Sequence, residues 1–357
     1  MKELPLPASY LRSIVALQTT PRRATREFVK AHLPASLRKT FLLILIVLPG
    51  LASGQVSSHS QNGHEIPYVI SVNVNMVVLH ATVQNEKNVL VGGLDKEQFQ
   101  IYENGALQQI KYFSHDDIPV TVGLVVDNSG SMRSKRSVVI AAAMAFARSS
   151  NPSDQLFVVN FNEHVSFALP ANVPFTDNKV ELENALSQII ASGETALYDA
   201  LDVALLHLNK GDRDKKILIV ISDGGDNASK RALEQVIALA RRSSAIIYSV
   251  GIFEEQDEDK NPVVLRRFAE ETGGEAYFPD SINEVTPICE RIARDIRSQY
   301  TLGFVPTDQA LDGTYRAIRV SARTPDRARL SVRTRPGYFA PLATPAPAAA
   351  TSNHESH

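Results

Sequence analysis

The sequence predicts an α/β fold, in which a doubly wound, mostly parallel sheet is inserted in or flanked by a small β-sandwich. Short apolar runs alternate with helical patterns in the middle of the chain, and segments of alternating polarity lie on both sides of it. The composition is that of a globular protein, with 44% hydrophobic and 21% charged residues among 357. Repeated alternation of strand and helix is typical of a sheet covered by helices on both faces.

The first predicted unit, residues 1–54, is a leader. A basic pair at 38–39 precedes an apolar run at 41–48, and small residues follow up to Gly54, which is the pattern of a secretory signal peptide. The run is shorter than the roughly 20 residues that a membrane-spanning helix needs. We therefore expect cleavage after Gly54 and a periplasmic or secreted protein. The alternative is an uncleaved signal segment that anchors the chain in a membrane, which would be its only membrane contact.

Two predicted β segments, residues 55–116 and 300–340, lie on either side of the central region. Their expected strands are 70–83, 99–103, 108–113, 300–305, 315–322 and 329–333. Because a short hairpin alone is only marginally stable, we expect the two segments to pair into one small β-sandwich. The Pro/Ala-rich residues 341–357 predict a disordered tail.

Residues 117–299 are predicted to form the α/β domain. Its principal strands are apolar on both faces, as buried parallel strands are. These strands are 120–126, 155–161, 216–221 and 245–252, with a short one at 275–278. The expected helices are 137–148, 180–190, 196–208, 232–242, 262–272 and 282–299.

Oxygen-bearing side chains gather where the predicted strands end. The first strand runs into Asp127, Ser129 and Ser131, the third runs into Asp223, and Thr195 immediately precedes a helix. Sheets of this kind bind ligands at the carboxyl ends of their strands, and oxygen ligands with few carboxylates suit Mg²⁺ or Mn²⁺. We therefore expect a divalent-cation site with an open position for an acidic group. The alternative is that these residues only cap turns and the following helix.

The same set resembles the metal-ion-dependent adhesion site of von Willebrand factor type A domains. The motif Asp127-x-Ser129-x-Ser131, Thr195 in a Gly-x-Thr-Ala-Leu context and Asp223 in Ser-Asp-Gly occur in the family's order. The resemblance implies that the two serines and the threonine bind the ion directly. It implies that the two aspartates bind it directly or through water.

The flanking segments 68–114 and 300–339 resemble those of bacterial exported proteins called VWFA-related. The resemblance includes a closing Arg335-Pro336-Gly337-Tyr338 motif. It implies an architecture and does not imply an activity.

The net charge of the chain and the absence of catalytic motifs argue against two classes of function, nucleic-acid binding and hydrolysis. Beyond residue 54 the chain carries eight more Asp/Glu than Lys/Arg, which argues against nucleic-acid binding. A metal-dependent hydrolase is disfavoured because Ser129 stands where an Asp-nucleophile phosphatase carries a second carboxylate, and because GxSxG and phosphate-loop motifs are absent. We therefore expect a non-enzymatic module that captures a carboxylate of a protein partner, with Mg²⁺ or Mn²⁺ as its only cofactor. A structural envelope protein with an unused metal site remains the third possibility.

Two features beside the expected site have open interpretations. The acidic run at 254–259 follows the fourth strand. We expect it to be a solvated loop, the alternative being that it tunes partner choice by repulsion. Asp226 and Asn227 follow Asp223 closely, and either orient that carboxylate or serve only the turn.

Overall fold

The structure is a computed structural model that describes residues 75–187, 191–254, 259–326 and 328–343. The predicted leader 1–54 and the predicted tail, apart from its first residues, lie outside these ranges. Within the described ranges, no helix combines the length and the apolar character that crossing a membrane requires.

The two flanking segments pair with each other, as the sequence predicts, and they form one antiparallel sheet. Its strand order is β3-β2-β12-β13-β1-β11-β4, and β14 pairs with β12. The first four strands are β1 (Val77–Gln84), β2 (Phe99–Glu103), β3 (Ala106–Gln108) and β4 (Ile110–Ser114). The later four are β11 (Tyr300–Phe304), β12 (Tyr315–Arg323), β13 (Arg329–Arg333) and β14 (Gly337–Phe339). Strands from both segments alternate in the order and share one buried core, so neither segment closes this core alone.

The expected single strand at 108–113 is wrong. The strand is interrupted at Gln109, because β3 pairs with β2 whereas β4 pairs with β11. Gln108 marks the break: its side chain donates to Thr307 Oγ1 at 3.0 Å and accepts from the Thr307 amide at 3.0 Å. The sequence shows the polarity of this segment but not the change of partner strand.

The central region forms a six-stranded sheet in the order β10-β9-β8-β5-β6-β7. Its strands are β5 (Val120–Asp127), β6 (Gln155–Phe161), β7 (Val165–Phe167), β8 (Lys215–Ser222), β9 (Ile246–Gly251) and β10 (Ala276–Tyr277). All pairs are parallel except that of the edge strand β7, which the sequence analysis did not predict. Every residue of β5 is buried, and all of them except Thr121 and Asp127 are apolar.

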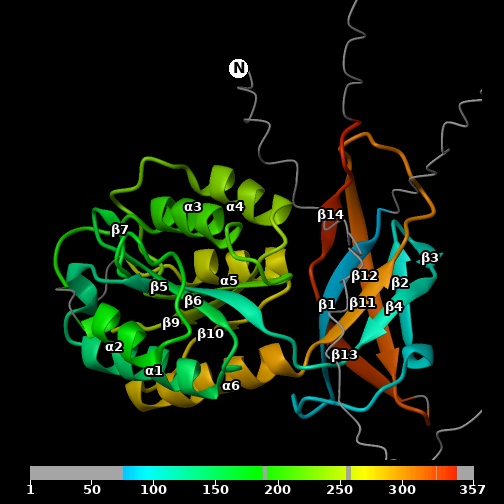
Figure 1. Ribbon diagram of the computed structural model, residues 1–357, viewed down its shortest axis with the longest axis horizontal. Coiled ribbons are helices and arrows are strands. Elements are labelled where there is room, and N and C mark those ends of the chain that lie inside the picture. The colour runs from blue at the N-terminus through cyan, green and yellow to red at the C-terminus, as the bar shows by residue number, and fades with distance from the viewer. Residues whose placement is uncertain (1–74, 188–190, 255–258, 327, 344–357) are drawn as a thin grey trace, which may run out of the picture. The chain divides into compact units, whose positions relative to one another are not determined.

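Helices cover both faces of this sheet (Figure 1), which confirms the doubly wound fold. Helix α1 (Arg136–Ser149) packs beside α2 (Lys179–Ser187) and α6 (Val285–Arg297) on one face. The other face carries α3 (Leu197–Leu208), α4 (Leu233–Arg242) and α5 (Pro262–Thr272). The expected helix 282–299 is divided into a short 3₁₀ turn, Ile282–Glu284, followed by α6.

The α/β domain is inserted between two neighbouring strands of the antiparallel sheet. Strand β4 precedes the domain in the chain and β11 follows it, and the two strands pair directly, with Ser114 opposite Thr301. The entry and exit of the domain are therefore held side by side.

The strand order of the parallel sheet reverses at β5. From β5 the chain proceeds to β6 on one side and later returns to β8 on the other side. Such a reversal opens a crevice at the carboxyl end of the central strand, where α/β sheets bind ligands. This is the end of β5 that carries Asp127.

Candidate metal centre

The first loop of the candidate site begins at the last residue of β5. Asp127 is only 2% exposed, and its Oδ1 accepts the Ser129 amide at 2.9 Å. This bond curls the chain so that the Ser129 and Ser131 hydroxyls lie 3.1 Å apart. The turn continues into a 3₁₀ helix at Gly130–Met132. The i, i+2, i+4 spacing thus presents three side-chain oxygens from one tight turn.

The second loop carries Thr195 and is joined to the first loop through main-chain bonds. The Gly130 amide donates to Gly193 O at 3.0 Å, and the Ser192 amide donates to Asn128 O at 2.9 Å. Thr195 itself is buried, with 7% exposure. The two loops therefore form one hydrogen-bonded unit in front of β5.

Gly193 fits this unit for two reasons. Its φ is +83°, a conformation that side chains disfavour. In addition, a Cβ at this position would lie 1.7 Å from Glu163 Oε2. The carboxylate of Glu163 therefore occupies the space beside the second loop.

The third loop follows β8 and brings Asp223 to the same place. Asp223 is 3% exposed, its Oδ1 accepts the Gly225 amide at 3.0 Å, and its Oδ2 accepts the Ser131 hydroxyl at 2.5 Å. Hydrogen bonds thus connect Asp127, Ser129, Ser131 and Asp223 into one chain of contacts. Thr195 is attached to this set through the main chain of its loop.

Two further polar residues, Ser222 and Asn227, hold the candidate ligands in place. The sequence analysis did not identify Ser222, and it associated Asn227 with Asp223. The Ser222 hydroxyl is completely buried, donates to Asp127 Oδ2 at 2.6 Å and accepts the Gly224 amide at 2.9 Å. Asn227 holds Thr195 rather than Asp223. Its side-chain Oδ1 accepts the Thr195 amide at 2.8 Å, and its main-chain amide donates to Thr195 O at 2.9 Å. Ser222 carried one weak signal, its position immediately before Asp223 at the strand end.

Burial disfavours the ionised form of the Asp127 carboxyl. Loss of water around the Asp127 carboxyl, together with the nearby Asp223 charge, raises its pKa to about 6, against the hydrogen bonds from Ser129 and Ser222. A divalent cation between the carboxylates would remove that cost, and all the available donors are oxygens, which Mg²⁺ and Mn²⁺ prefer. The residues therefore fit such an ion.

The donor set has few carboxylates. In the part of the chain that the structure describes, no three His, Cys, Asp or Glu side chains gather in a way that could hold a metal ion. A site built here depends on hydroxyl groups for the rest of its ligands, as the sequence motif predicts.

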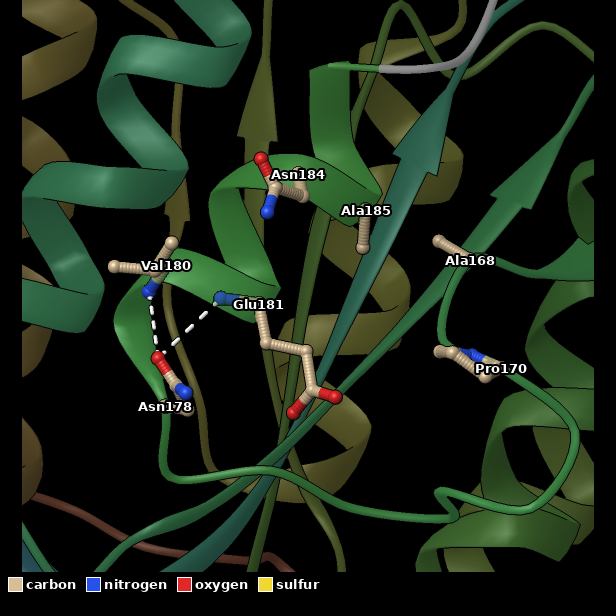
Figure 2. A pocket seen from close by; sticks show the side chains of 7 residues that line it. All are labelled: Ala168, Pro170, Asn178, Val180, Glu181, Asn184 and Ala185. Carbon is tan, nitrogen blue, oxygen red and sulfur yellow. Dashed lines mark hydrogen bonds between the residues drawn. The ribbon is translucent and has the colours of Figure 1, made fainter.

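A separate hollow of about 350 Å³ lies beside α2, and Figure 2 shows the side chains that line it. Its polar groups bond to the first turn of α2: Asn178 Oδ1 accepts the amides of Val180 and Glu181 at 3.0 and 3.4 Å. The Glu181 carboxylate accepts the Thr176 hydroxyl at 2.5 Å. None of the residues predicted for the metal site lines this hollow.

Fold and site together define a doubly wound α/β domain with a cluster of side-chain oxygens at the carboxyl end of its central strand β5. Residues 122–225 match the family model described as von Willebrand factor type A domain. The chain therefore contains a von Willebrand factor type A domain, and the matched span includes every residue of the candidate centre.

Comparison with known proteins gives remote similarities. An uncharacterized protein of Borreliella burgdorferi is 24% identical over 162 residues, which are 45% of this chain and 47% of that protein. The chain thus spans about half the length of this curated relative. A solved von Willebrand factor type A structure from Catenulispora acidiphila is 13% identical, covering 76% of this chain and 74% of the other with a TM-score of 0.44.

Two further similar structures were solved with a metal ion bound. Proximal thread matrix protein 1 from the mussel byssus, with a zinc-occupied MIDAS motif, is 17% identical and covers 53% of this chain and 48% of the other, with a TM-score of 0.44. The manganese-loaded TRAP protein of Plasmodium vivax is 15% identical and covers 68% of this chain and 99% of the other, with a TM-score of 0.39.

Proposed function

We propose that this chain is an exported, non-enzymatic binding module that holds one divalent cation, Mg²⁺ or Mn²⁺. Asp127, Ser129, Ser131, Thr195 and Asp223 would hold the ion, and an acidic group of a protein partner would complete its coordination. Export rests on the leader pattern of residues 1–54.

The observation that carries this proposal is the convergence of three loops on the carboxyl end of β5. The first and third loops meet through the contact between Ser131 Oγ and Asp223 Oδ2, and the first and second meet through main-chain bonds. Turn capping alone accounts for the Asp127 bond to the Ser129 amide. It does not account for buried carboxylates from two strands that share a hydroxyl network.

The charge of the donor set indicates the chemistry of the partner. Two carboxylates neutralise a divalent ion formally, and hydroxyls add no charge, so the ion keeps an affinity for a further anionic oxygen. A carboxylate of a partner protein satisfies that requirement. When bound, the ion would supply an electrophilic contact, and the residues of this chain would fix its place and exclude water from one side.

The substitution Asp127→Ala tests the proposal. We expect loss of Mg²⁺ and Mn²⁺ binding in equilibrium dialysis of the full chain, with Zn²⁺ as a further ion, and an unchanged far-ultraviolet circular dichroism spectrum. Asp127 ends a strand and lies outside the apolar clusters of the sheet, so its loss should leave the fold intact.

Asp212→Ala is the matched control, because Asp212 is exposed and precedes β8 at the opposite edge of the sheet. Metal binding by the Asp127 variant at the level of this control would contradict the proposed site. Loss of the helical and strand signal in the Asp127 variant would instead show that the residue is structural.

A further inference from the structure

We propose that the outward face of strands β12 and β13 binds an acidic polysaccharide through three arginines, Arg319, Arg323 and Arg329. This inference goes beyond the proposed function, because it concerns the antiparallel sheet and requires no metal ion. We call these three residues the arginine face.

The alternation of exposed and buried residues places the three side chains on one side of the sheet. In β12, Arg319 and Arg323 both occupy exposed positions of the alternating pattern. Arg329 is exposed at the start of β13 and is in register with Arg323. Residues directly opposite in an antiparallel pair point to the same face, with Cβ atoms about 5 Å apart. The three guanidinium groups therefore share the outward face of this hairpin.

The opposition of Arg323 and Arg329 is unfavourable by itself, since like charges directly across a strand pair destabilise a sheet. Among the described residues, neither guanidinium forms a hydrogen bond or an ion pair. By contrast, Arg333 on the same strand contacts the carboxylates of Asp295 and Glu275, at 2.6 and 3.0 Å. The protein thus provides counter-ions for Arg333 and none for the arginine pair, whose repulsion an anion from outside the protein would relieve.

Arg319 is oriented on the same face by an aromatic ring. Its guanidinium carbon lies 4.2 Å from the centre of the Tyr102 ring, which belongs to the neighbouring strand β2. The stack fixes the plane of the guanidinium group. Within the described part of the chain its N–H groups have no acceptor, so they remain available to a ligand.

Carboxylates of the protein do not neutralise this face. The hairpin 315–333 has one acidic residue, Asp326, and its carboxylate accepts a threonine hydroxyl within the turn. Arg319 lies opposite Tyr102 and Arg323 lies opposite Arg329, so no carboxylate stands directly across from the arginine face. The acidic run at 254–259, of which the structure describes the first and last residues, belongs to the α/β domain. In a chain that is acidic beyond residue 54, this face is a local reversal of charge.

The arrangement of the charges favours a chain-like anion. Arg319 and Arg323 are four residues apart on one strand, which corresponds to about 13 Å. Ser321 lies between them on the same face, and Ser331 follows Arg329 on the outward face of β13. Arginine donates paired hydrogen bonds to carboxylate, sulfate or phosphate oxygens, and a serine hydroxyl bonds equally well to a donor or an acceptor. An acidic polysaccharide offers oxyanions and hydroxyl groups in a linear repeat.

The same positions offer little to a lipid surface. Binding at a membrane interface depends in part on apolar side chains that enter the headgroup region. The outward residues from Arg319 to Arg323 and from Arg329 to Ser331 are arginines and serines alone. A polysaccharide is therefore the partner that fits this face better.

Binding is measured with the full chain in EDTA, so that the metal centre contributes nothing. The probes are fluorescent dextran sulfate and fluorescent dextran of the same length, which differ only in their sulfate groups. The test variant removes the arginine face and is Arg319→Gln/Arg323→Gln/Arg329→Gln.

The control variant removes three exposed positive charges of the α/β domain and is Arg148→Gln/Lys210→Gln/Arg266→Gln. At low salt we expect dextran sulfate to bind the wild type and the control with affinities within about twofold of each other. The test variant should bind about tenfold or more weakly, because each lost arginine–sulfate pair contributes about two- to threefold. Dextran should bind none of the proteins, and high salt should abolish the difference.

Equal weakening of the test and control variants, or no binding of dextran sulfate by the wild type, would overturn the inference. Two further probes, phosphatidylglycerol vesicles and polyglutamate, are compared at the same concentration of charge. Arginine-dependent binding that is tighter to either of them would assign the face to a membrane or to an acidic protein, and would also overturn it. Since metal is absent throughout, none of these results depends on the centre at Asp127.

The single variant Arg323→Gln examines the repulsion separately. Because the substitution removes one of two opposed charges, its thermal midpoint at low salt should be no lower than that of the wild type. A lower midpoint would show that contacts within the protein stabilise Arg323, and would remove the reason to infer an external anion.

Discussion

Asn227 shows how a single side chain connects two loops that lie far apart in the sequence. Its amide and side-chain oxygen both bond the main chain of Thr195, and its side-chain nitrogen bonds Asp259. The residue therefore fixes the Thr195 loop. Among the described residues, its side chain forms no hydrogen bond to the other four candidate ligands. Residues that orient metal ligands in this way typically change metal affinity by tenfold or more when they are lost.

The substitution Asn227→Ala isolates this role. We expect the affinity for Mg²⁺ to fall by about tenfold, because the Thr195 amide loses its side-chain acceptor, while the circular dichroism spectrum stays that of the wild type. Titration calorimetry of the full chain provides the measurement. Asn184→Ala, an exposed asparagine on α2, is the control, and equal affinities of the two variants would exclude a positioning role.

At this scale the sequence predicted the candidate ligands, but it did not predict Ser222 as a support and it associated Asn227 with Asp223 rather than with Thr195. Asp127, Ser129 and Ser131 follow from local spacing, because a turn after a buried strand places them together. Ser222 and Asn227 act through bonds to residues about 30 to 95 positions away. No local pattern reports such pairings, which depend on the strand order that only the folded sheet establishes.

Helix α6 is the element that joins the α/β domain to the antiparallel sheet. Its Asp295 is 2% exposed and accepts three hydrogen bonds, from Thr82 Oγ1 at 2.7 Å, Tyr248 Oη at 2.8 Å and Arg333 Nη2 at 2.6 Å. Burial and the Asp295 charge raise the pKa of the Tyr248 phenol well above its usual value, so it remains a donor. One carboxylate thus bonds β1, β9 and β13.

Replacement of Asp295 by alanine should destabilise the protein strongly. The buried Tyr248 phenol and the buried Thr82 hydroxyl lose their acceptor, and each unsatisfied buried group costs about 1 to 3 kcal/mol of unfolding free energy, whereas Arg333 keeps the Glu275 carboxylate at 3.0 Å. Urea unfolding of Asp295→Ala and of Asp280→Ala, an exposed control, measures the difference. A loss no larger than that of the control would show that the network contributes little to stability.

Elements were predicted well where polarity alone defines them. The bounds of α5 and β13 agree with the sequence analysis, and the apolar strands β5 and β6 agree within one residue. Short edge elements were missed: β7 has three residues with only partial burial, and β14 lies in the closing Arg335-Pro336-Gly337-Tyr338 motif. Arg335 explains that motif in part, because it donates to Gly337 O and to Arg241 O, each at 2.8 Å.

For the whole molecule, insertion of the domain between β4 and β11 links the candidate metal centre to the flanking sheet. The Asp295 network and the pairing of β4 with β11 connect the two sheets. A ligand that binds only the folded state stabilises all of it, by about 2.7 kcal/mol at a hundredfold excess over Kd. Metal binding should therefore be visible in the unfolding of the full chain.

The raised pKa of Asp127 determines whether the wild type or Asp127→Asn is the more stable protein in the absence of metal. Its folded value of about 6 exceeds the usual 3.8, so ionisation of this carboxyl lowers stability as the pH rises through that interval. Asp127→Asn lacks that charge. Without metal at pH 7.5, the variant should be the more stable protein, by on the order of 1 to 3 kcal/mol, and the gap should close as the pH falls below about 4.

The most direct test of the metal centre is thermal unfolding of the full chain and Asp127→Asn at pH 7.5, each in EDTA and in Mg²⁺ or Mn²⁺. We predict that the variant has the higher midpoint in EDTA, and that the metal raises the midpoint of the wild type but not that of the variant. Equal responses of both proteins to the ion, or no response of the wild type at any metal concentration, would contradict the assignment of Asp127 to a cation site.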